Sequence, residues 1–193
     1  MEAFGRLRKR LRLPEGSAEA LRARVLWEEA QLLADPASFK RSVPLAGFWD
    51  LFGPYASQSP HLTARLAGCD EVWLLAATIG PKLPARAQEC FAKALAFEGY
   101  VMDFFGTWLA DQAMRRLVAS LGAVPGTLTR RLMPGTRGFA LEAQGVFVAL
   151  AGEALGLSLT TGFALVPEKS VTAVIGRKAS FMPQYSLAKT NRP

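Results

Sequence analysis

Hydrophobic residues recur at helical spacing in several parts of the chain. Ser17 can cap a helix whose apolar positions share one side, with charged residues elsewhere: Leu21, Val25, Leu32 and Leu33. Asp35-Pro36 ends this helix, because proline disfavours a helical conformation in the residue before it. A short helix is expected to begin at Ser59-Pro60, which supplies a cap and a proline at the first helical position, and to end at Gly68.

The longest helical block covers residues 83–121, where Ala, Leu, Met, Arg and Glu dominate. Gly99 and Gly106 favour two helices, or one kinked helix, over a single rod. Gly122, Pro125 and Gly126 end the block. Residues 141–155 again favour helix, whereas residues 46–58 contain many Gly, Pro and Ser residues and are interpreted as a loop.

Short apolar runs predict the strands. Residues 70–78 are typical of a buried strand, and residues 39–45 and 127–133 are shorter candidates. Residues 157–166 and 170–175 are expected to form an antiparallel hairpin joined by Pro167-Glu168-Lys169. Long helices with antiparallel strands, and no regular β-α-β alternation, predict an α+β fold.

Composition bounds the class of protein. The 193 residues, half of them hydrophobic, predict one domain over residues 1–193. No apolar run reaches the roughly 20 residues that a membrane span requires, and the basic N-terminus lacks the apolar run of a secretory signal. The two cysteines, Cys69 and Cys90, are too few for a disulfide framework and fit a reducing compartment. We therefore expect a cytoplasmic protein that does not bind membranes.

The net charge of +7 is unevenly distributed. Arginine and lysine gather in the first 13 residues, in the basic tail at 177–193, and in a middle cluster of Arg115, Arg116, Arg130, Arg131 and Arg137. Such surfaces attract nucleic acid, anionic lipid or an acidic protein, or are simply solvated. Nucleic acid is the less favoured partner, because the chain has no zinc-finger spacing, RNP-like motif or helix-turn-helix signal.

The common enzyme motifs are absent from the sequence. There is no phosphate-binding loop, dinucleotide fingerprint or nucleophile elbow. His61 is the sole histidine, and with two distant cysteines it is poor material for a metal site. The chain also lacks the D-x-H-x-x-G sequence that usually presents a histidine to cobalamin, so any cobalamin would be carried by another protein.

The segment 127–138, TLTRRLMPGTRG, is the strongest candidate for ligand binding. An arginine at the end of a strand, shortly before Pro-Gly, can make a bidentate contact with a carboxylate. Gly135 lets the backbone approach a ligand closely. The same residues also fit an ordinary strand-to-loop turn with a surface arginine.

Four sequence blocks, in order, resemble the activation domain of cobalamin-dependent methionine synthase, and especially its free-standing bacterial relatives. They are LLAATIGPKL at 74–83, FFGTWLADQA at 104–113, LTRRLMPGT at 128–136 and GLSLTTGFALVPEKSVTAVIG at 156–176. Residues 1–60 match only loosely. The resemblance implies a bent antiparallel sheet with flanking helices, and a domain that presents S-adenosylmethionine to a corrinoid for reductive remethylation.

The resemblance also implies the site and the partners. Arg131 matches the arginine that contacts the methionyl carboxylate, Met133 the residue whose backbone touches the ligand, and Gly135 the turn glycine. Asp111 stands where the family has an acidic residue, normally glutamate, and Thr136 replaces the usual tyrosine. Cobalamin would come only through a corrinoid-binding protein or methionine synthase core, with an acidic flavodoxin- or ferredoxin-type electron donor.

The substitutions at positions 111 and 136 leave two functions open. The first is an activation component that binds S-adenosylmethionine and acts in trans, a methyltransferase-associated role in methionine biosynthesis. The alternative is a non-catalytic module that docks on a corrinoid protein or electron donor and has a degenerate ligand site.

Overall fold

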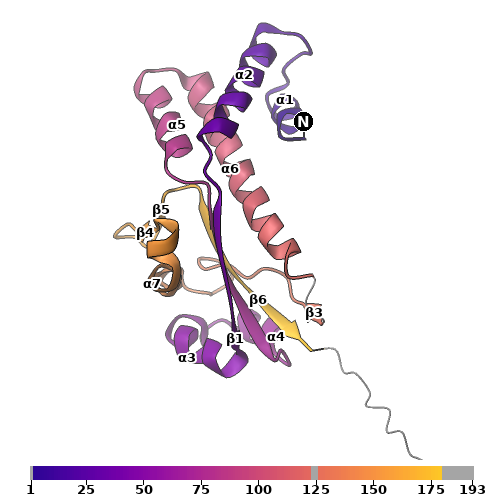
Figure 1. The fold of residues 1–193 in the computed structure, drawn as a ribbon, viewed down its shortest axis with the longest axis vertical. Helices are drawn as coiled ribbons and strands as arrows, with labels where there is room; N and C mark the ends of the chain where they lie inside the picture. The colour runs from indigo at the N-terminus through magenta and orange to yellow at the C-terminus, as the bar shows by residue number, and fades with distance from the viewer. Residues whose placement is uncertain (1, 123–125, 180–193) are drawn as a thin grey trace, which may run out of the picture.

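A four-stranded antiparallel sheet forms the centre of the protein (Figure 1). The computed structural model describes residues 2–122 and 126–179. The strands lie in the order β1 (Ala37–Pro44), β2 (Glu71–Thr78), β6 (Ser170–Lys178) and β3 (Thr127–Leu128), and each neighbouring pair is antiparallel. Helices flank this sheet, so the predicted α+β class with an antiparallel sheet is confirmed.

Helices cover both faces of the sheet because its central strand is apolar on both sides. Successive side chains of a strand point to opposite faces. Leu74 packs in a core with Phe52 and Phe147, which belong to α3 (Leu45–Ala56) and α7 (Gln144–Leu155). Leu75, the next residue, packs with Met114 of α6 (Ala96–Ala119).

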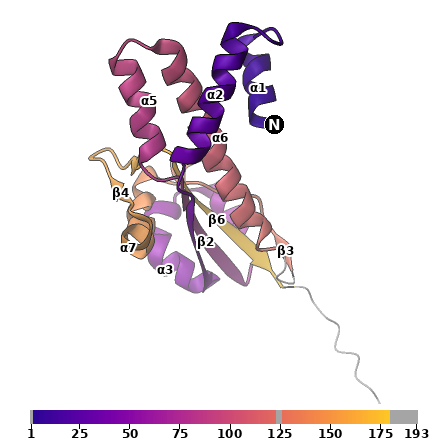
Figure 2. The same cartoon turned by 45° about the horizontal axis from the view of Figure 1, so that its top comes forward.

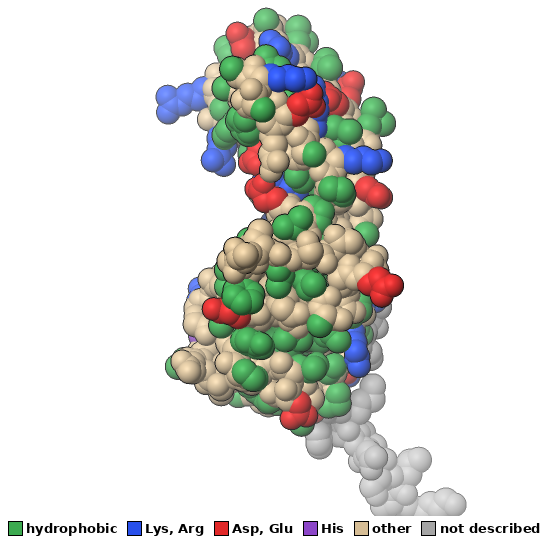
Figure 3. All heavy atoms as spheres, turned by 90° about the vertical axis from the view of Figure 1, so that its left-hand side faces the viewer, with side chains coloured by type: hydrophobic (Ala, Val, Ile, Leu, Met, Phe, Trp, Pro, Cys, Tyr) green, Lys and Arg blue, Asp and Glu red, His purple; other side chains and the backbone are tan. Residues whose placement is uncertain are grey.

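The long helix α6 belongs to two cores. Met114 and Leu117 near its C-terminal end lie on the sheet, whereas its buried residues from Val101 to Ala110 pack in a separate helical layer. That layer contains α1 (Glu2–Leu11), α2 (Ala18–Leu33) and α5 (Lys82–Ala92), which lie together above the sheet in Figures 1 and 2. On the face seen in Figure 3, charged side chains gather on this helical part, and hydrophobic and uncharged groups dominate below it.

Several predicted elements are confirmed with shifted ends. Strand β1 corresponds to the prediction at 39–45 and β2 to that at 70–78. Ser17 caps α2 by accepting a hydrogen bond from the N–H of Ala20 at 3.2 Å, and Ser59 caps α4 (Pro60–Leu66) in the same way. A 3-10 turn, η1 (Leu141–Ala143), leads into α7. Helix α1 was not predicted.

The expected loop at 46–58 is wrong, because residues 45–56 form α3. Phe48 and Phe52 lie one helical turn apart and are fully buried against each other, with ring centroids 4.9 Å apart. Pro54 lies in the last turn of the helix, where a missing N–H disturbs few of the hydrogen bonds. Burial of aromatic surface therefore outweighs the turn-forming composition of this segment.

The expected apolar face of α2 is wrong for three of its four residues, whereas Leu33 packs partly against the helical layer. Leu21, Val25 and Leu32 are exposed, and the helix buries a different set against its neighbours: Ala20, Ala23, Leu26 and Ala30. Alanines let helix α2 lie close to α6, where Leu26 and Trp27 also pack, while three other large side chains point outward.

Two further boundaries differ from the predictions. The break between α5 and α6 falls at residues 93–95, where Ala94 has a φ of 56°, and the two glycines lie inside α6. Residues 157–166 do not pair with the last strand. They form their own small hairpin of β4 (Ser158–Leu159) and β5 (Leu165–Val166), and β6 pairs with β2 and β3.

Candidate functional site

The site loop, residues 127–139, runs beside β6 but does not form the continuous strand expected at 127–133. After β3, the N–H of Thr129 donates to the carbonyl of Gly176 at 2.9 Å, and the N–H of Gly176 donates to Oγ1 of Thr129 at 2.9 Å. Leu132 and Val174 then exchange two backbone hydrogen bonds. Arg130 and Arg131 lie in the irregular stretch between these contacts.

The turn after Leu132 is closed by its own hydrogen bonds. Gly135 has a φ of 80°, which favours glycine, and its N–H donates to the carbonyl of Phe139 at 2.7 Å. The carbonyl of Met133 accepts hydrogen bonds from the N–H of Thr136 at 3.2 Å and from its Oγ1 at 2.6 Å. Thr136 therefore stabilises the turn, and the backbone carbonyl of Met133 is already hydrogen-bonded to it.

Asp111 of α6 connects this loop to the helix. Its Oδ1 lies 3.3 Å from Nη2 of Arg131, and its Oδ2 lies 2.6 Å from Nε of Arg115. Partial burial raises the pKa of Asp111, but the hydrogen bonds from Arg115 and Arg131 outweigh burial and bring the pKa below its ordinary value. The carboxylate is thus charged at neutral pH and orients the Arg131 guanidinium.

Arg131 borders a cavity of about 260 Å³ between the site loop and α4. Four arginines line it, together with one histidine and three loop side chains: Arg65, Arg130, Arg131, Arg137, His61, Leu132, Met133 and Thr136. We call this the arginine cavity. None of these described lining residues carries a carboxylate, so the charge of the cavity favours an anionic group.

Helix α4 is fixed against the site loop by Ser59. The Ser59 hydroxyl donates to the carbonyl of Arg137 at 2.7 Å and accepts from the N–H of Leu62 at 3.2 Å. Nη1 of Arg137 lies 3.2 Å from Nε2 of His61. Desolvation, together with the charges of Arg137 and Arg65, lowers the pKa of His61. His61 is therefore neutral at physiological pH and can accept a hydrogen bond there.

A second cavity, of about 640 Å³, lies between α1 and α6. Its lining combines aromatic rings with charged and polar groups: Arg6, Arg10, Tyr100, Asp103, Phe104, Thr107, Trp108 and Asp111. The Arg10 guanidinium lies 5.9 Å from the ring centroids of both Tyr100 and Phe104. Asp111 borders this aromatic cavity and also binds Arg131 of the arginine cavity.

In the structure, four of the five sequence-predicted residues lie in the arginine cavity or are ion-paired to a residue of it. Arg131, Met133 and Thr136 line one cavity, and Asp111 is ion-paired to Arg131. Gly135 shapes the turn without lining that cavity. Neither Arg65 nor His61 was predicted as a site residue, because no local pattern places α4 beside a loop some seventy residues later.

The described part of the chain offers no obvious place for a metal. Over residues 2–122 and 126–179, no group of three or more His, Cys, Asp or Glu side chains could hold an ion. Cys69 and Cys90 are buried and not bonded to each other, as expected. Among these same residues, no helix has the length and apolar character to cross a bilayer.

Comparison with known proteins finds similarity among solved structures but not among family models or curated sequences. No family model matches the chain, and no curated protein matches it. Among solved structures, the crystal structure of the MetH reactivation domain bound to AdoHcy has a TM-score of 0.46 and 14% sequence identity. The match covers 89% of this chain and 70% of that one. The ligand named there belongs to that domain.

Proposed function

We propose that this protein binds S-adenosylmethionine through the site loop and assists, in trans, the reductive remethylation of a corrinoid held by a separate protein. The observation that carries the proposal is the orientation of Arg131 by Asp111 at the edge of the arginine cavity. An ion-paired guanidinium on an irregular loop is prepared to receive a carboxylate without further ordering.

The size of the arginine cavity suits one end of this ligand. Its volume of about 260 Å³ lies below the roughly 300–1,000 Å³ typical of pockets that enclose a whole small molecule. The amino-acid end of S-adenosylmethionine fits this space, with its carboxylate on Arg131. Beyond Asp111, the aromatic cavity of about 640 Å³ has walls suited to a purine ring.

The corrinoid belongs to the partner in this proposal. An electron donor of flavodoxin or ferredoxin type would reduce it, and the sulfonium methyl group would pass to cobalt and leave S-adenosylhomocysteine. The chain itself contributes ligand binding and orientation. The arginines around the site loop support an acidic partner, because opposite charge raises the encounter rate.

The direct test is calorimetric titration with S-adenosylmethionine of the wild-type protein and of Arg131→Ala. Loss of a charge-assisted contact costs about 1.5–3 kcal/mol, which weakens binding about 10- to 150-fold. Asp111 keeps Arg115 as a partner in this variant, so the fold should persist. Arg41→Ala, an exposed arginine on β1 at the opposite edge of the sheet, is the matched control and should bind as the wild type does.

The docking module is the second candidate, and it rests on the closed turn. The Met133 carbonyl is already occupied by Thr136, and Arg131 already has a carboxylate partner. If folded wild-type protein gives no heat with S-adenosylmethionine, this candidate is favoured. It then predicts a salt-sensitive complex with an acidic corrinoid protein, in which reversing the charge of Arg130 or Arg137 matters more than Arg131→Ala.

A further inference from the structure

Three bulky hydrophobic side chains of helix α2 point away from the core that its alanines, Leu26 and Trp27 contact. Leu21, Val25 and Leu32 are 59%, 64% and 87% exposed. Together with Glu28 they occupy one stripe of the helix, spaced by four, three and four residues. We call this the outer stripe. The opposite side of the helix, rich in alanine, already packs in the helical layer, so packing within the chain does not explain the outer stripe.

A cavity lies at one end of the outer stripe, and the exposed side chain of Leu32 lies at the other. Leu21 and Arg24 help to line a cavity of about 200 Å³ formed with the end of the α1–α2 connection and α1. Leu32, three turns further along, projects into solvent. A second helix α2 in antiparallel orientation would place its Leu32 opposite Leu21, and the reverse contact would form at the other end. A single two-fold rotation axis would thus fill the cavity of each copy with Leu32 of the other.

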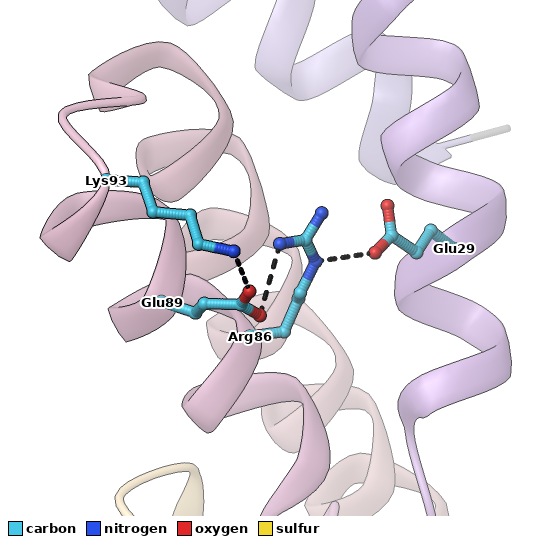
Figure 4. A network of polar contacts seen from close by, with 4 residues as sticks. All are labelled: Glu29, Arg86, Glu89 and Lys93. Carbon is cyan, nitrogen blue, oxygen red and sulfur yellow. Dashed lines mark hydrogen bonds and ion pairs between the residues drawn. The ribbon is translucent and has the colours of Figure 1, made fainter.

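The charges along α2 are also self-complementary in this orientation. Glu29 and Arg22 are already engaged within the chain, by Arg86 at 2.7 Å (Figure 4) and by Glu98. Glu28 in the outer stripe and Arg24 beside it have no ion pair among the residues that the structure describes. In an antiparallel pair of helices, Arg24 of each copy lies near the partner's Glu28, so opposite charges meet twice.

We propose that the outer stripe is the contact surface of a homodimer, in which helix α2 packs antiparallel against the same helix of a second copy. Leu32 of each copy enters the cavity beside Leu21 of the other. Val25 packs near the axis, and Arg24 pairs with the partner's Glu28. Because every contact occurs twice, a helix with only a short apolar stripe gains two anchors and two ion pairs per interface.

The test is sedimentation equilibrium of the full chain over nanomolar to micromolar concentrations. The wild type should be a reversible dimer. Leu32→Glu should weaken it by about 100-fold or more, because each dimer loses two anchors and gains two buried charges. Leu51→Glu changes another exposed leucine, on α3, and should leave the dimer intact. Circular dichroism checks that both variants are folded.

A charge exchange gives an independent readout of the orientation. Arg24→Glu should weaken the dimer by about tenfold, and combining it with Glu28→Arg should restore the wild-type constant. A wild-type protein that is monomeric at every concentration would overturn the proposal. So would a dimer that Leu32→Glu leaves unchanged, or one in which the double exchange fails to restore association.

Discussion

Phe52→Ala tests the packing of α3, the element that the sequence pattern did not predict. Phe52 is fully buried, and its ring centroid lies 4.9 Å from that of Phe48, 5.3 Å from Phe147 and 6.0 Å from Phe139. Truncating such a phenylalanine costs about 3–5 kcal/mol of unfolding free energy, from lost burial and the cavity left behind. This is a large share of the roughly 5–15 kcal/mol typical of a domain.

Urea unfolding followed by circular dichroism measures this loss of unfolding free energy, and thermal melting gives a second readout. At about 2–4 °C per kcal/mol for a chain of this size, the melting temperature should fall by about 6–20 °C. The matched control is Leu51→Ala, which removes an exposed side chain from the neighbouring position of the same helix. If Phe52→Ala costs no more than Leu51→Ala, residues 45–56 do not pack into the core as described.

Further substitutions test three other parts of the structure. Gly176→Ala should destabilise by about 1–3 kcal/mol, because its Cβ would lie 2.6 Å from Sγ of Cys69; Gly145→Ala, with open space in α7, should be neutral or stabilising by up to about 1 kcal/mol in the same denaturation assay. The folded-state pKa of Asp111 lies below its ordinary value of 3.8, so its ion pairs stabilise the fold above that pH and are lost as the pH falls. Asp111→Asn should therefore reduce stability at neutral pH by no more than about 1 kcal/mol and flatten its decline in acid, which melting curves across pH would show. Ser59→Ala removes a buried cap and leaves a loop carbonyl without its donor, so thermal unfolding should report a loss of about 1–3 kcal/mol.

The sequence predicts those elements whose local pattern agrees with their packing. Strand β2 is apolar on both faces and is buried on both, and the caps at Ser17 and Ser59 act through backbone groups only three residues away. Elements that depend on distant partners were predicted poorly. Residues 45–56 form a helix because Phe52 meets aromatic rings of α7 and the site loop, contacts that no local window contains.

The candidate site likewise contains residues that local sequence predicts and residues that only tertiary packing brings there. Arg131 and the Pro134–Thr136 turn are visible in the sequence because arginine, proline and glycine have specific conformational and charge properties. Arg65 is not, because it comes from a short helix that only tertiary packing brings beside the site loop. The exposed face of α2 could not be predicted either: hydrophobic spacing identifies an apolar stripe but does not say whether this chain or a second copy covers it.

Helix α6 lies between the proposed ligand site and the outer stripe of α2. The inner face of α2 reaches α6 through Trp27, whose ring centroid lies 5.4 Å from that of Trp108 in the wall of the aromatic cavity. The outer stripe faces away from this contact. A change at Leu32 should therefore alter association without altering ligand binding, and Arg131→Ala should do the reverse, since residues that share no partner contribute additively. Dimerisation would instead tune the ligand site only if it moved α2 against α6, and the Trp27–Trp108 contact is where that coupling would pass.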